Sequence, residues 1–517
     1  MTCLKFSLTS LLVSFVICTA LHAQKTQLLP RSTPEAEAVS SKGIIAFLDA
    51  AAKSKNEFHS IMILRHGKVV AEGWWNPYSA SLKHTMYSTS KSFTATAAGF
   101  AISEKRLSID DKVISFFPND LPDTVSPYLA ELTVKDVLMM SDGQEPDPTS
   151  TVVPRDSNWV KGFLALPFLH KPGTTFLYNS LGTYMLSAIV QKVTGQKIID
   201  YLKPRLFDPL GIEGIDWETN YQGINTGGWG LRLKTEDMAK FGQLFLQKGM
   251  WNGKQILPAN WVQEASTVKI IQHPNYSQEK RDSSDWEQGY CYQMWRCRHN
   301  AFRADGAFGQ FIIVMPDKDA VVAITAETPD MQNEIDLVWK YLLPAMSDDK
   351  LADDKTNDAI LKKKLSALAL EVPAKNASAL EKELSGKTFS FDTNERHIKN
   401  VAFLFKDGTC HVTLKTDTAA YDLDYGAGNW VQGTTAKAGP NLLFAAKENY
   451  RSLKPFKIDG AYTWKDEHTL QLTLRYIESP HTETFLCHFD NNNISIDAEN
   501  SYDYGKKKIE IKGMLMQ

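Results

Sequence analysis

The chain has 517 residues, too many for one ordinary hydrophobic core, so we expect two domains. Hydrophobic residues make up 43% of the chain and charged residues 23%, proportions typical of a globular protein rather than a disordered or fibrous one. The formal net charge of −3 argues against nucleic acid and anionic membranes as partners.

Residues 1–23 differ in composition from the rest of the chain. They hold a single lysine at Lys5, an apolar stretch over residues 6–20 and the small residue Ala23 at their end. A charged start, an apolar centre and a small residue at the cleavage position are typical of a secretory signal peptide. We therefore expect cleavage after Ala23 and a secreted or periplasmic protein. Cleavage would change the formal net charge from −3 to −4, because residues 1–23 contain one lysine and no acidic residue.

Two other interpretations of this segment stay open. A retained membrane anchor needs a longer apolar run, and serines interrupt this one, so we expect no membrane segment after cleavage. A lipid anchor at Cys18 needs a small residue before the cysteine, where the chain has Ile17.

Residues 31–345 have the element pattern of an α/β catalytic domain. An alanine-rich helix is predicted over residues 40–54, followed by a hairpin around His66-Gly67. Strands predicted late in the region must rejoin this hairpin to build one sheet with helices packed against it. The hairpin strands are residues 60–64 and 69–71, the further helices 134–140, 182–193 and 236–246, and the late strands 290–295, 310–315 and 320–325.

The composition changes after this region. Residues 347–364 are rich in Asp, Lys and Asn, so we assign residues 346–380 to a solvated linker or exposed helix. Residues 381–517 alternate between short strands and Gly or Asx turns, which indicates a separate all-β domain, either a sandwich or a small barrel. We find no catalytic constellation in it, and we expect His481 and His488 at strand surfaces. Its clearest strands are residues 401–405, 410–414, 469–475 and 484–489.

The most informative motif is Ser88-Thr89-Ser90-Lys91, at the start of an apolar helical stretch. A serine hydroxyl must pass its proton to a base as it attacks, and a desolvated neutral lysine can accept that proton. Residues three apart share one helix face, so Ser88 and Lys91 point the same way. The spacing alone is not decisive, because it recurs at Ser266/Lys269, Ser277/Lys280 and Ser347/Lys350.

Sequence context separates the first pair from the others. Ser277 and Ser347 lie in charged, loop-like stretches where a lysine would stay solvated and protonated, and Ser266 is expected to end a helix. Only Ser88 begins a helix, since apolar residues recur at helical spacing after it. Such a helix could desolvate Lys91, and its dipole would favour negative charge developing at its N-terminus.

A serine–lysine pair also needs a proton carrier and an oxyanion hole. Tyr178 is the candidate carrier, because a Pro-Gly turn leads into a short loop that could aim its phenol. Gly306 opens a predicted strand, where a glycine permits close backbone approach, so an N–H of this strand could join that of Ser88. The alternatives are a packing role for Tyr178 and an ordinary bulge at Gly306.

These three segments together resemble the serine β-lactamase and penicillin-binding-protein superfamily. The similarity is greatest to its branch of class C enzymes, D-amino-acid peptidases, esterases and nylon-oligomer hydrolases. Residues 133–143, 228–239 and 251–254 also look like this branch. The resemblance implies an α/β (α+β) catalytic domain with an antiparallel sheet and helices on both faces.

The resemblance also implies an acyl-enzyme mechanism with assigned roles. Ser88 would be the nucleophile, Lys91 its activating partner and Tyr178 the proton shuttle to the leaving group and then from water. The N–H groups of Ser88 and Ala307 would form the oxyanion hole beside Gly306.

The chain departs from the family pattern at two places. The family's Tyr-x-Asn reads Tyr178-Asn179-Ser180, so Ser180 stands where an amide would hold the lysine and the substrate. The Lys-Thr-Gly or His-x-Gly strand motif reads Ala-Asp-Gly, and Asp305 would repel a substrate carboxylate. Three arginines could replace the lost cation, namely Arg296, Arg298 and Arg303.

The function predicted from these features is an exported serine hydrolase that cleaves a small ester or amide through an acyl-enzyme on Ser88. One alternative is a β-lactamase or D-Ala carboxypeptidase, and another is a non-catalytic protein that binds a cell-wall or acyl ligand. Aromatic side chains could line an acyl pocket. The candidates are Trp74, Trp75, Trp159, Trp229, Trp286 and Trp295.

The cysteines and histidines do not have metal-site spacing, so we predict neither a metal nor a cofactor. Four cysteines remain after signal cleavage, and an exported chain can oxidise them. Pairing within each domain, Cys291 with Cys297 and Cys410 with Cys487, is one expectation, and four buried free thiols is the other. The oligomeric state is not predicted.

Overall fold

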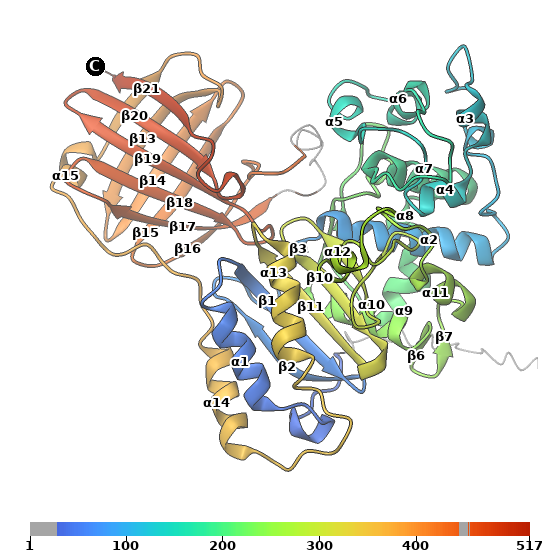
Figure 1. The fold of residues 1–517 in the computed structure, drawn as a ribbon. Coiled ribbons are helices and arrows are strands. Elements are labelled where there is room, and N and C mark those ends of the chain that lie inside the picture. Colours follow the sequence, from blue (N-terminus) through green and yellow to red (C-terminus); the bar gives the residue numbers. More distant parts are fainter. Residues whose placement is uncertain (1–27, 444–452, 454, 517) are drawn as a thin grey trace, which may run out of the picture.

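The computed structural model describes residues 28–443, 453 and 455–516. The predicted signal peptide lies outside these residues. Figure 1 shows a catalytic domain built on a central sheet with helices on both faces, and a β-barrel beside it. This bears out the fold class inferred from the resemblance. Within the described ranges, no helix is both long enough and apolar enough to cross a membrane.

The catalytic domain is built on an antiparallel sheet in which the first and last parts of the domain meet. In the described part of the chain the sheet has six strands in the order β2-β1-β11-β10-β9-β8. The hairpin predicted around His66-Gly67 is confirmed, and it pairs with the late strand β11. The strands are β1 (Glu57–Arg65), β2 (Lys68–Trp74), β8 (Trp295–Arg296), β9 (Phe302–Gly306), β10 (Gln310–Met315) and β11 (Ala320–Glu327).

Helices cover both faces of this sheet because successive strand residues point to opposite sides. Ile61 packs toward α1 and α13, whereas Met62 packs toward α2 and α10. Helix α14 packs beside α1 in the region predicted as a linker or exposed helix (Figure 1). These helices are α1 (Ser41–Ala51), α2 (Ser90–Ser103), α10 (Thr235–Leu246), α13 (Met331–Leu337) and α14 (Lys355–Ser366).

Shorter helices and strands extend the α2 side of the domain. Helix α7 packs against α2 and carries residues that reach the candidate site. The helices are α3 (Pro127–Glu131), α4 (Val134–Leu138), α5 (Thr149–Val152), α6 (Trp159–Ala165), α7 (Ser180–Thr194), α8 (Ile198–Leu202), α9 (Asp208–Leu210), α11 (Ala259–Ser266) and α12 (Gln278–Asp282). The strands are β3 (His84–Thr85), β4 (Asp216–Trp217), β5 (Leu231–Leu233), β6 (Met250–Trp251) and β7 (Lys254–Gln255).

The strand predicted over residues 290–295 is wrong. Only Trp295 of this segment lies in a strand, and the strands paired with β10 are β9 and β11. The segment is held away from the ladder because Gln293 has a left-handed backbone (φ 59°). Its side chain bonds Thr183 Oγ1 on α7 and the carbonyls of Val137 and Leu138 on α4.

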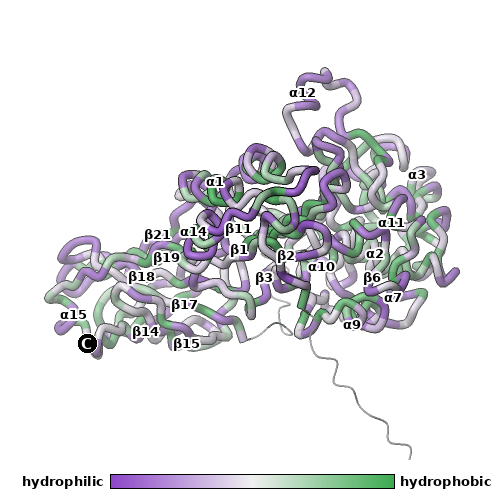
Figure 2. The backbone as a smooth tube through the Cα atoms, turned by 90° about the horizontal axis from the view of Figure 1, so that it is seen from below, coloured by the Kyte–Doolittle hydropathy of each residue, from purple (hydrophilic) through white to green (hydrophobic). Residues whose placement is uncertain are grey.

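The C-terminal domain is a β-barrel, one of the two predicted forms. Within the described residues its sheet closes where β15 runs parallel to β17. Figure 2 shows strands such as β14 and β18 alternating between hydrophilic and hydrophobic residues, and the hydrophobic ones fill the interior. The elements are α15 (Leu380–Leu384), β12 (Lys387–Phe391), β13 (Ile398–Lys406), β14 (Thr409–Thr416), β15 (Ala420–Ala427), β16 (Val431–Thr435), β17 (Phe456–Trp464), β18 (Thr469–Tyr476), β19 (Thr482–Asp490), β20 (Asn493–Asn500) and β21 (Ile509–Leu515).

The four described cysteines are buried free thiols, so the expected pairing within each domain is wrong and the alternative holds. Cys291 and Cys297 pack into two different hydrophobic clusters of the catalytic domain. Cys410 and Cys487 lie on non-adjacent barrel strands, both within the barrel core. Burial raises the pKa of all four thiols, which keeps them protonated and unreactive.

Candidate active site

Ser88 lies in a tight turn that the rest of the domain holds on two sides. It is the middle residue of a 3₁₀ turn (Tyr87–Thr89) that leads directly into α2. The turn is anchored because Met86 N–H donates to Leu231 O (2.9 Å) and Thr89 Oγ1 donates to Gln310 O (2.8 Å). The turn is therefore fixed to both β5 and β10.

Gly306 lets the end of β9 approach this turn. A Cβ atom at position 306 would lie 2.2 Å from Met86 O, which no side chain could tolerate. The predicted close backbone approach is therefore present, and the backbone it reaches is the turn that carries Ser88. Ala307 follows immediately and lines the same cavity as Ser88.

Lys91 is buried beneath the turn with three acceptors around its nitrogen. Its Nζ lies 3.2 Å from Ser88 Oγ, 3.1 Å from Ser180 Oγ and 2.7 Å from Gly228 O. An ammonium can donate to all three, whereas a neutral amine can donate to two and accept from the third. Gly228 O can only accept, so a neutral Lys91 is able to accept the proton of Ser88.

The electrostatic environment of Lys91 favours this neutral form. Burial lowers the pKa of Lys91 from its ordinary 10.5 to about 7, while the carboxylates of Asp147 and Asp305 oppose the shift. Near neutral pH a substantial fraction of Lys91 is therefore deprotonated. The pair Ser88–Lys91 thus has the contact and the protonation state that a lysine-activated serine requires.

Tyr178 lies beside this pair, in the loop that precedes α7. Its ring packs nearly parallel to Trp295 (centroids 5.9 Å apart, 22°), and Lys91 Nζ lies 4.9 Å from its ring centre. Burial raises the pKa of the Tyr178 phenol, although a hydrogen bond with Ser88 opposes this. Tyr178 therefore stays protonated, with its hydroxyl next to Ser88, as a proton carrier should.

The residues after Tyr178 divide the tasks of the family's Tyr-x-Asn motif. Asn179 is buried and caps α7, accepting from Gly182 N–H (2.9 Å). Ser180 accepts from Lys91, and its own N–H donates to Asp147 Oδ2 (3.0 Å). The hydroxyl of Ser180 thus makes the lysine contact expected of it.

A cavity of about 400 Å³ opens over Ser88. Of the six tryptophans predicted for an acyl pocket, Trp229, Trp286 and Trp295 line it, and the other three do not. The C-terminal domain contributes Leu442 and Leu443. The lining is therefore mostly apolar and comes from both domains.

The charged groups at this cavity are acidic. Asp147 and Asp305 line it, and its described lining includes no Arg, Lys or His. Arg303 is fully buried and ion-paired with Asp305 (2.8 Å), so it compensates that charge. The other two arginines proposed as replacement cations are bonded elsewhere, Arg296 to Asn300 and Arg298 to Asp285 and Asp336.

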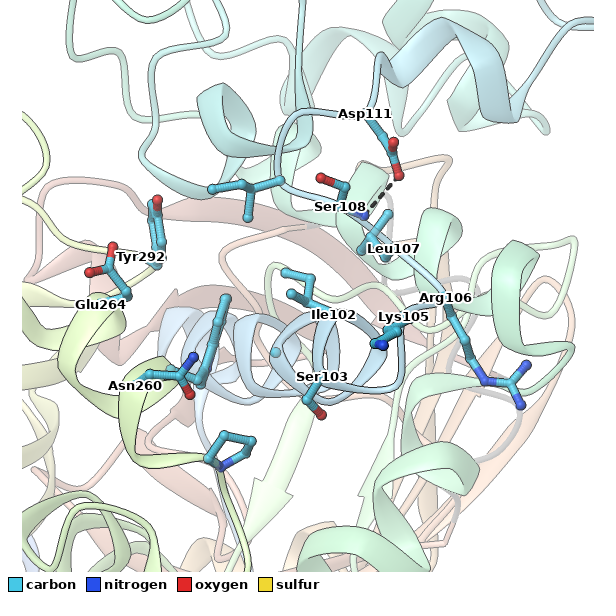
Figure 3. A pocket seen from close by; sticks show the side chains of 14 residues that line it. Ile102, Ser103, Lys105, Arg106, Leu107, Ser108, Asp111, Asn260, Glu264 and Tyr292 are labelled. Atoms are coloured by element: carbon cyan, nitrogen blue, oxygen red, sulfur yellow. Dashed lines mark hydrogen bonds between the residues drawn. The ribbon is translucent and has the colours of Figure 1, made fainter.

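A larger cavity, of about 690 Å³, lies at the other end of α2 (Figure 3). Ser103 and Lys105 line it, but both are exposed. The Ser103 hydroxyl donates to Phe100 O of its own helix (2.8 Å), and Ser108 N–H donates to Asp111 (2.8 Å). This cavity has serine and lysine without the buried contact that joins Ser88 to Lys91.

The sequence did not indicate one group that reaches the site. His481 was expected at a strand surface, but it is wholly buried, and its Nε2 lies 2.5 Å from Tyr87 Oη. His488, on the strand β19 that begins just after His481, is partly exposed, as expected. No local pattern could have revealed the His481 contact, because it joins residues 394 positions apart in different domains.

Comparison with known proteins agrees with this geometry. The Beta-lactamase family model matches residues 57–342, more than half of the chain. A 6-aminohexanoate-dimer hydrolase from Paenarthrobacter ureafaciens is 26% identical over 289 residues, which is 52% of this chain and 73% of the relative.

Solved structures show the same fold. A Bacillus anthracis protein named for 6-aminohexanoate-dimer hydrolase superposes with a TM-score of 0.51 at 22% identity, covering 62% of this chain and 87% of its own. A Bacteroides dorei protein named for β-lactamase superposes with a TM-score of 0.50 at 16% identity. The superposition covers 59% of this chain and 99% of the Bacteroides dorei chain.

Proposed function

The chain belongs to the Beta-lactamase family and is a serine hydrolase, and from this premise we propose that it cleaves a small ester or amide through an acyl-enzyme on Ser88. The observation that supports this most is the contact between Ser88 Oγ and the buried Nζ of Lys91 (3.2 Å). Its surroundings lower the pKa of Lys91 to about 7.

In the proposed reaction, neutral Lys91 takes the Ser88 proton as Oγ attacks the substrate carbonyl. The carbonyl oxygen becomes an oxyanion, which the N–H groups of Ser88 and Ala307 stabilise. Tyr178 passes a proton to the leaving alcohol or amine as the bond to the carbonyl carbon breaks, and it regains a proton from protonated Lys91. Water then attacks the acyl-enzyme with its proton taken through the same groups, which releases the acid and restores Ser88.

The charges at the cavity support a substrate without a carboxylate near the reacting bond. Asp305 is offset by Arg303, but Asp147 forms hydrogen bonds and no ion pair among the described residues. A substrate carboxylate placed here would be repelled. The β-lactamase and D-Ala carboxypeptidase alternatives require such a carboxylate and are therefore less favoured.

The relative from Paenarthrobacter ureafaciens is named for a dimer of 6-aminohexanoate. A linear aliphatic acyl group of that kind would suit the apolar walls of Trp229, Trp286 and Trp295. We also propose export, which the composition of residues 1–23 supports. N-terminal sequencing of the mature protein should then begin at Gln24.

A series of p-nitrophenyl esters tests the substrate class. Three esters would share one short acyl chain and differ only in a methyl, an ammonium or a carboxylate group that lies inside the cavity close to the ester carbonyl. The carboxylate ester should have a kcat/KM at least about tenfold below the neutral ester. A preference for the carboxylate, or a stable penicilloyl adduct, would instead favour a penicillin-interacting enzyme.

A further inference from the structure

Two aromatic residues beside the proposed oxyanion hole hold an uncommon backbone. Tyr87, just before Ser88, has φ 45°, and Phe308, just after Ala307, has φ 67°. Bulky side chains rarely adopt this left-handed region, and they stay there only where the surroundings hold them. The proposed N–H donors of Ser88 and Ala307 therefore each follow or precede a residue whose backbone conformation must be held by contacts with the surrounding protein.

The imidazole of His481 contacts both of these residues. Its Nε2 is hydrogen-bonded to Tyr87 Oη (2.5 Å). Its ring meets the Phe308 ring edge to face, with centroids 4.8 Å apart. The Tyr87 and Phe308 rings also pack against each other, with their centroids 5.5 Å apart. One buried side chain of the C-terminal domain thus joins the two segments that carry the proposed donors.

The orientation of His481 is fixed by a carboxylate. Its Nδ1 lies 2.9 Å from Glu327 Oε1, and the same oxygen accepts from Ser501 Oγ (2.8 Å). Because a carboxylate accepts, Nδ1 carries the proton and Nε2 is free to accept from Tyr87 O–H. The next residue, Thr328, donates its N–H to Phe308 O (3.1 Å). Glu327 at the end of β11 therefore sets the position of His481 while Thr328 holds the Phe308 turn.

We propose that His481 is a positioning residue for the oxyanion hole, so that the barrel domain is a working part of the active site. This inference rests on the proposed function, since it concerns the N–H donors of Ser88 and Ala307. Donors stabilise an oxyanion only if they are set before the reaction, and a shift of about 1 Å can reduce the rate about 100-fold. The same domain places Leu442 and Leu443 in the cavity wall.

His481→Ala tests the proposal in the full chain with a p-nitrophenyl ester. We expect kcat to fall about 10- to 100-fold while KM changes less than about threefold, because substrate binding is kept and transition-state stabilisation is lost. The rate at which a fluorophosphonate labels Ser88 should fall by a similar factor. His481→Gln, which can still bond both partners, should recover part of kcat.

Tyr87→Phe removes the hydroxyl that is bonded to His481 and to the backbone of Leu442, and keeps the ring. It should lower kcat in the same direction, and the double variant with His481→Ala should be no worse than His481→Ala alone, because the two side chains act through one contact. If His481→Ala fails to fold, Tyr87→Phe and His481→Gln still decide the question. Wild-type kcat in Tyr87→Phe would then overturn the proposal, because the contact with His481 would not be needed.

Two controls separate positioning from general loss of structure. His488 lies on β19, the strand that begins just after His481, and its side chain is partly exposed, so His488→Gln should leave kcat unchanged. Arg475 pairs with Glu57 across the domain boundary (2.6 Å), so Arg475→Gln weakens docking without touching Tyr87. We expect it to lower the melting temperature but to reduce kcat less than His481→Ala does. An equal loss of kcat in Arg475→Gln would overturn a specific role for His481.

The outcomes also distinguish failure of the His481 role from failure of the proposed acyl-enzyme function. If His481→Ala is labelled by the fluorophosphonate and hydrolyses the ester at the wild-type rate, while Ser88→Ala does neither, the positioning role is overturned and the acyl-enzyme mechanism stands. If wild-type Ser88 is never labelled, the proposed function fails, and the role of His481 fails with it.

Discussion

Helix α2 has a cavity at each of its ends, and both contain serine and lysine. At its N-terminal end Lys91 is 1% exposed and contacts Ser88, in a cavity of about 400 Å³. At its C-terminal end Ser103 and Lys105 are exposed, although the cavity is larger, about 690 Å³ (Figure 3). Desolvation and contact, rather than size, thus distinguish the candidate active site.

The largest expected difference between the two ends is at the serines. Ser88→Ala should lower kcat by at least about 10⁴-fold, because removing a nucleophile leaves only the residual catalysis of the remaining site. Ser103→Ala, the matched change at the other end, should leave kcat unchanged. Ester hydrolysis measures both, and circular dichroism checks folding. Comparable activity in the two variants would remove the distinction between the cavities.

The lysines should differ next. Lys91→Met should lower kcat about 10³-fold, because the proton acceptor is lost. Lys105→Met should have no effect. Turnover that survives in Lys91→Met at the wild-type rate would show that another group activates Ser88.

Lys91→Met should also stabilise the protein. In wild type, the folded state releases the Lys91 proton near pH 7 and the unfolded chain near 10.5. Between these values the folded state binds fewer protons, so wild-type stability rises with pH through that window. Replacing the buried amine should raise the free energy of unfolding by about 1–4 kcal/mol near pH 7, as seen when buried ions are replaced by apolar groups. The gain should shrink toward pH 10.5, and chemical denaturation at several pH values measures it.

The pH dependence of the reaction follows from the same residue. Because the neutral form of Lys91 is the active one, kcat/KM should fall about tenfold per unit below a pKa of about 7 and level off above it. The raised pKa of Tyr178 keeps its phenol protonated, so no loss is expected just above neutrality. Activity that increases as the pH falls from 7 to 5 would contradict a neutral lysine.

The smallest expected effect is at Ser180. Ser180→Ala removes one of three acceptors around Lys91 Nζ, so kcat should fall about three- to tenfold, as for loss of one hydrogen bond between neutral groups. Ser108→Ala in the larger cavity should leave kcat unchanged. A loss above about 100-fold in Ser180→Ala would show that Ser180 does more than hold Lys91.

Features that depend on neighbouring residues were predictable from the sequence. The spacing of Ser88 and Lys91 lies within one helical turn, and the short apolar runs of β1 and β2 can be seen within a short window. The Pro-Gly turn indicated Tyr178 and the family resemblance indicated Ser180, and the structure places both beside Lys91.

Features that depend on distant contacts were not predictable. The apolar character of residues 290–295 suggested a strand, but Gln293 is bound to two helices that only the fold brings near. In the sequence, His481 resembles any polar residue at the start of a strand, because its contact with Tyr87 forms only when the barrel packs against the catalytic domain. Tertiary contacts override local propensity at these positions.

Intact-protein mass spectrometry tests the central claim most directly. Wild type, Ser88→Ala and Ser103→Ala would each be exposed to a fluorophosphonate, a p-nitrophenyl ester and a penicillin. The account predicts one adduct from each of the first two reagents in wild type and Ser103→Ala, none in Ser88→Ala, and none from penicillin. An adduct that persists in Ser88→Ala, or no adduct on any protein, would contradict an acyl-enzyme on Ser88.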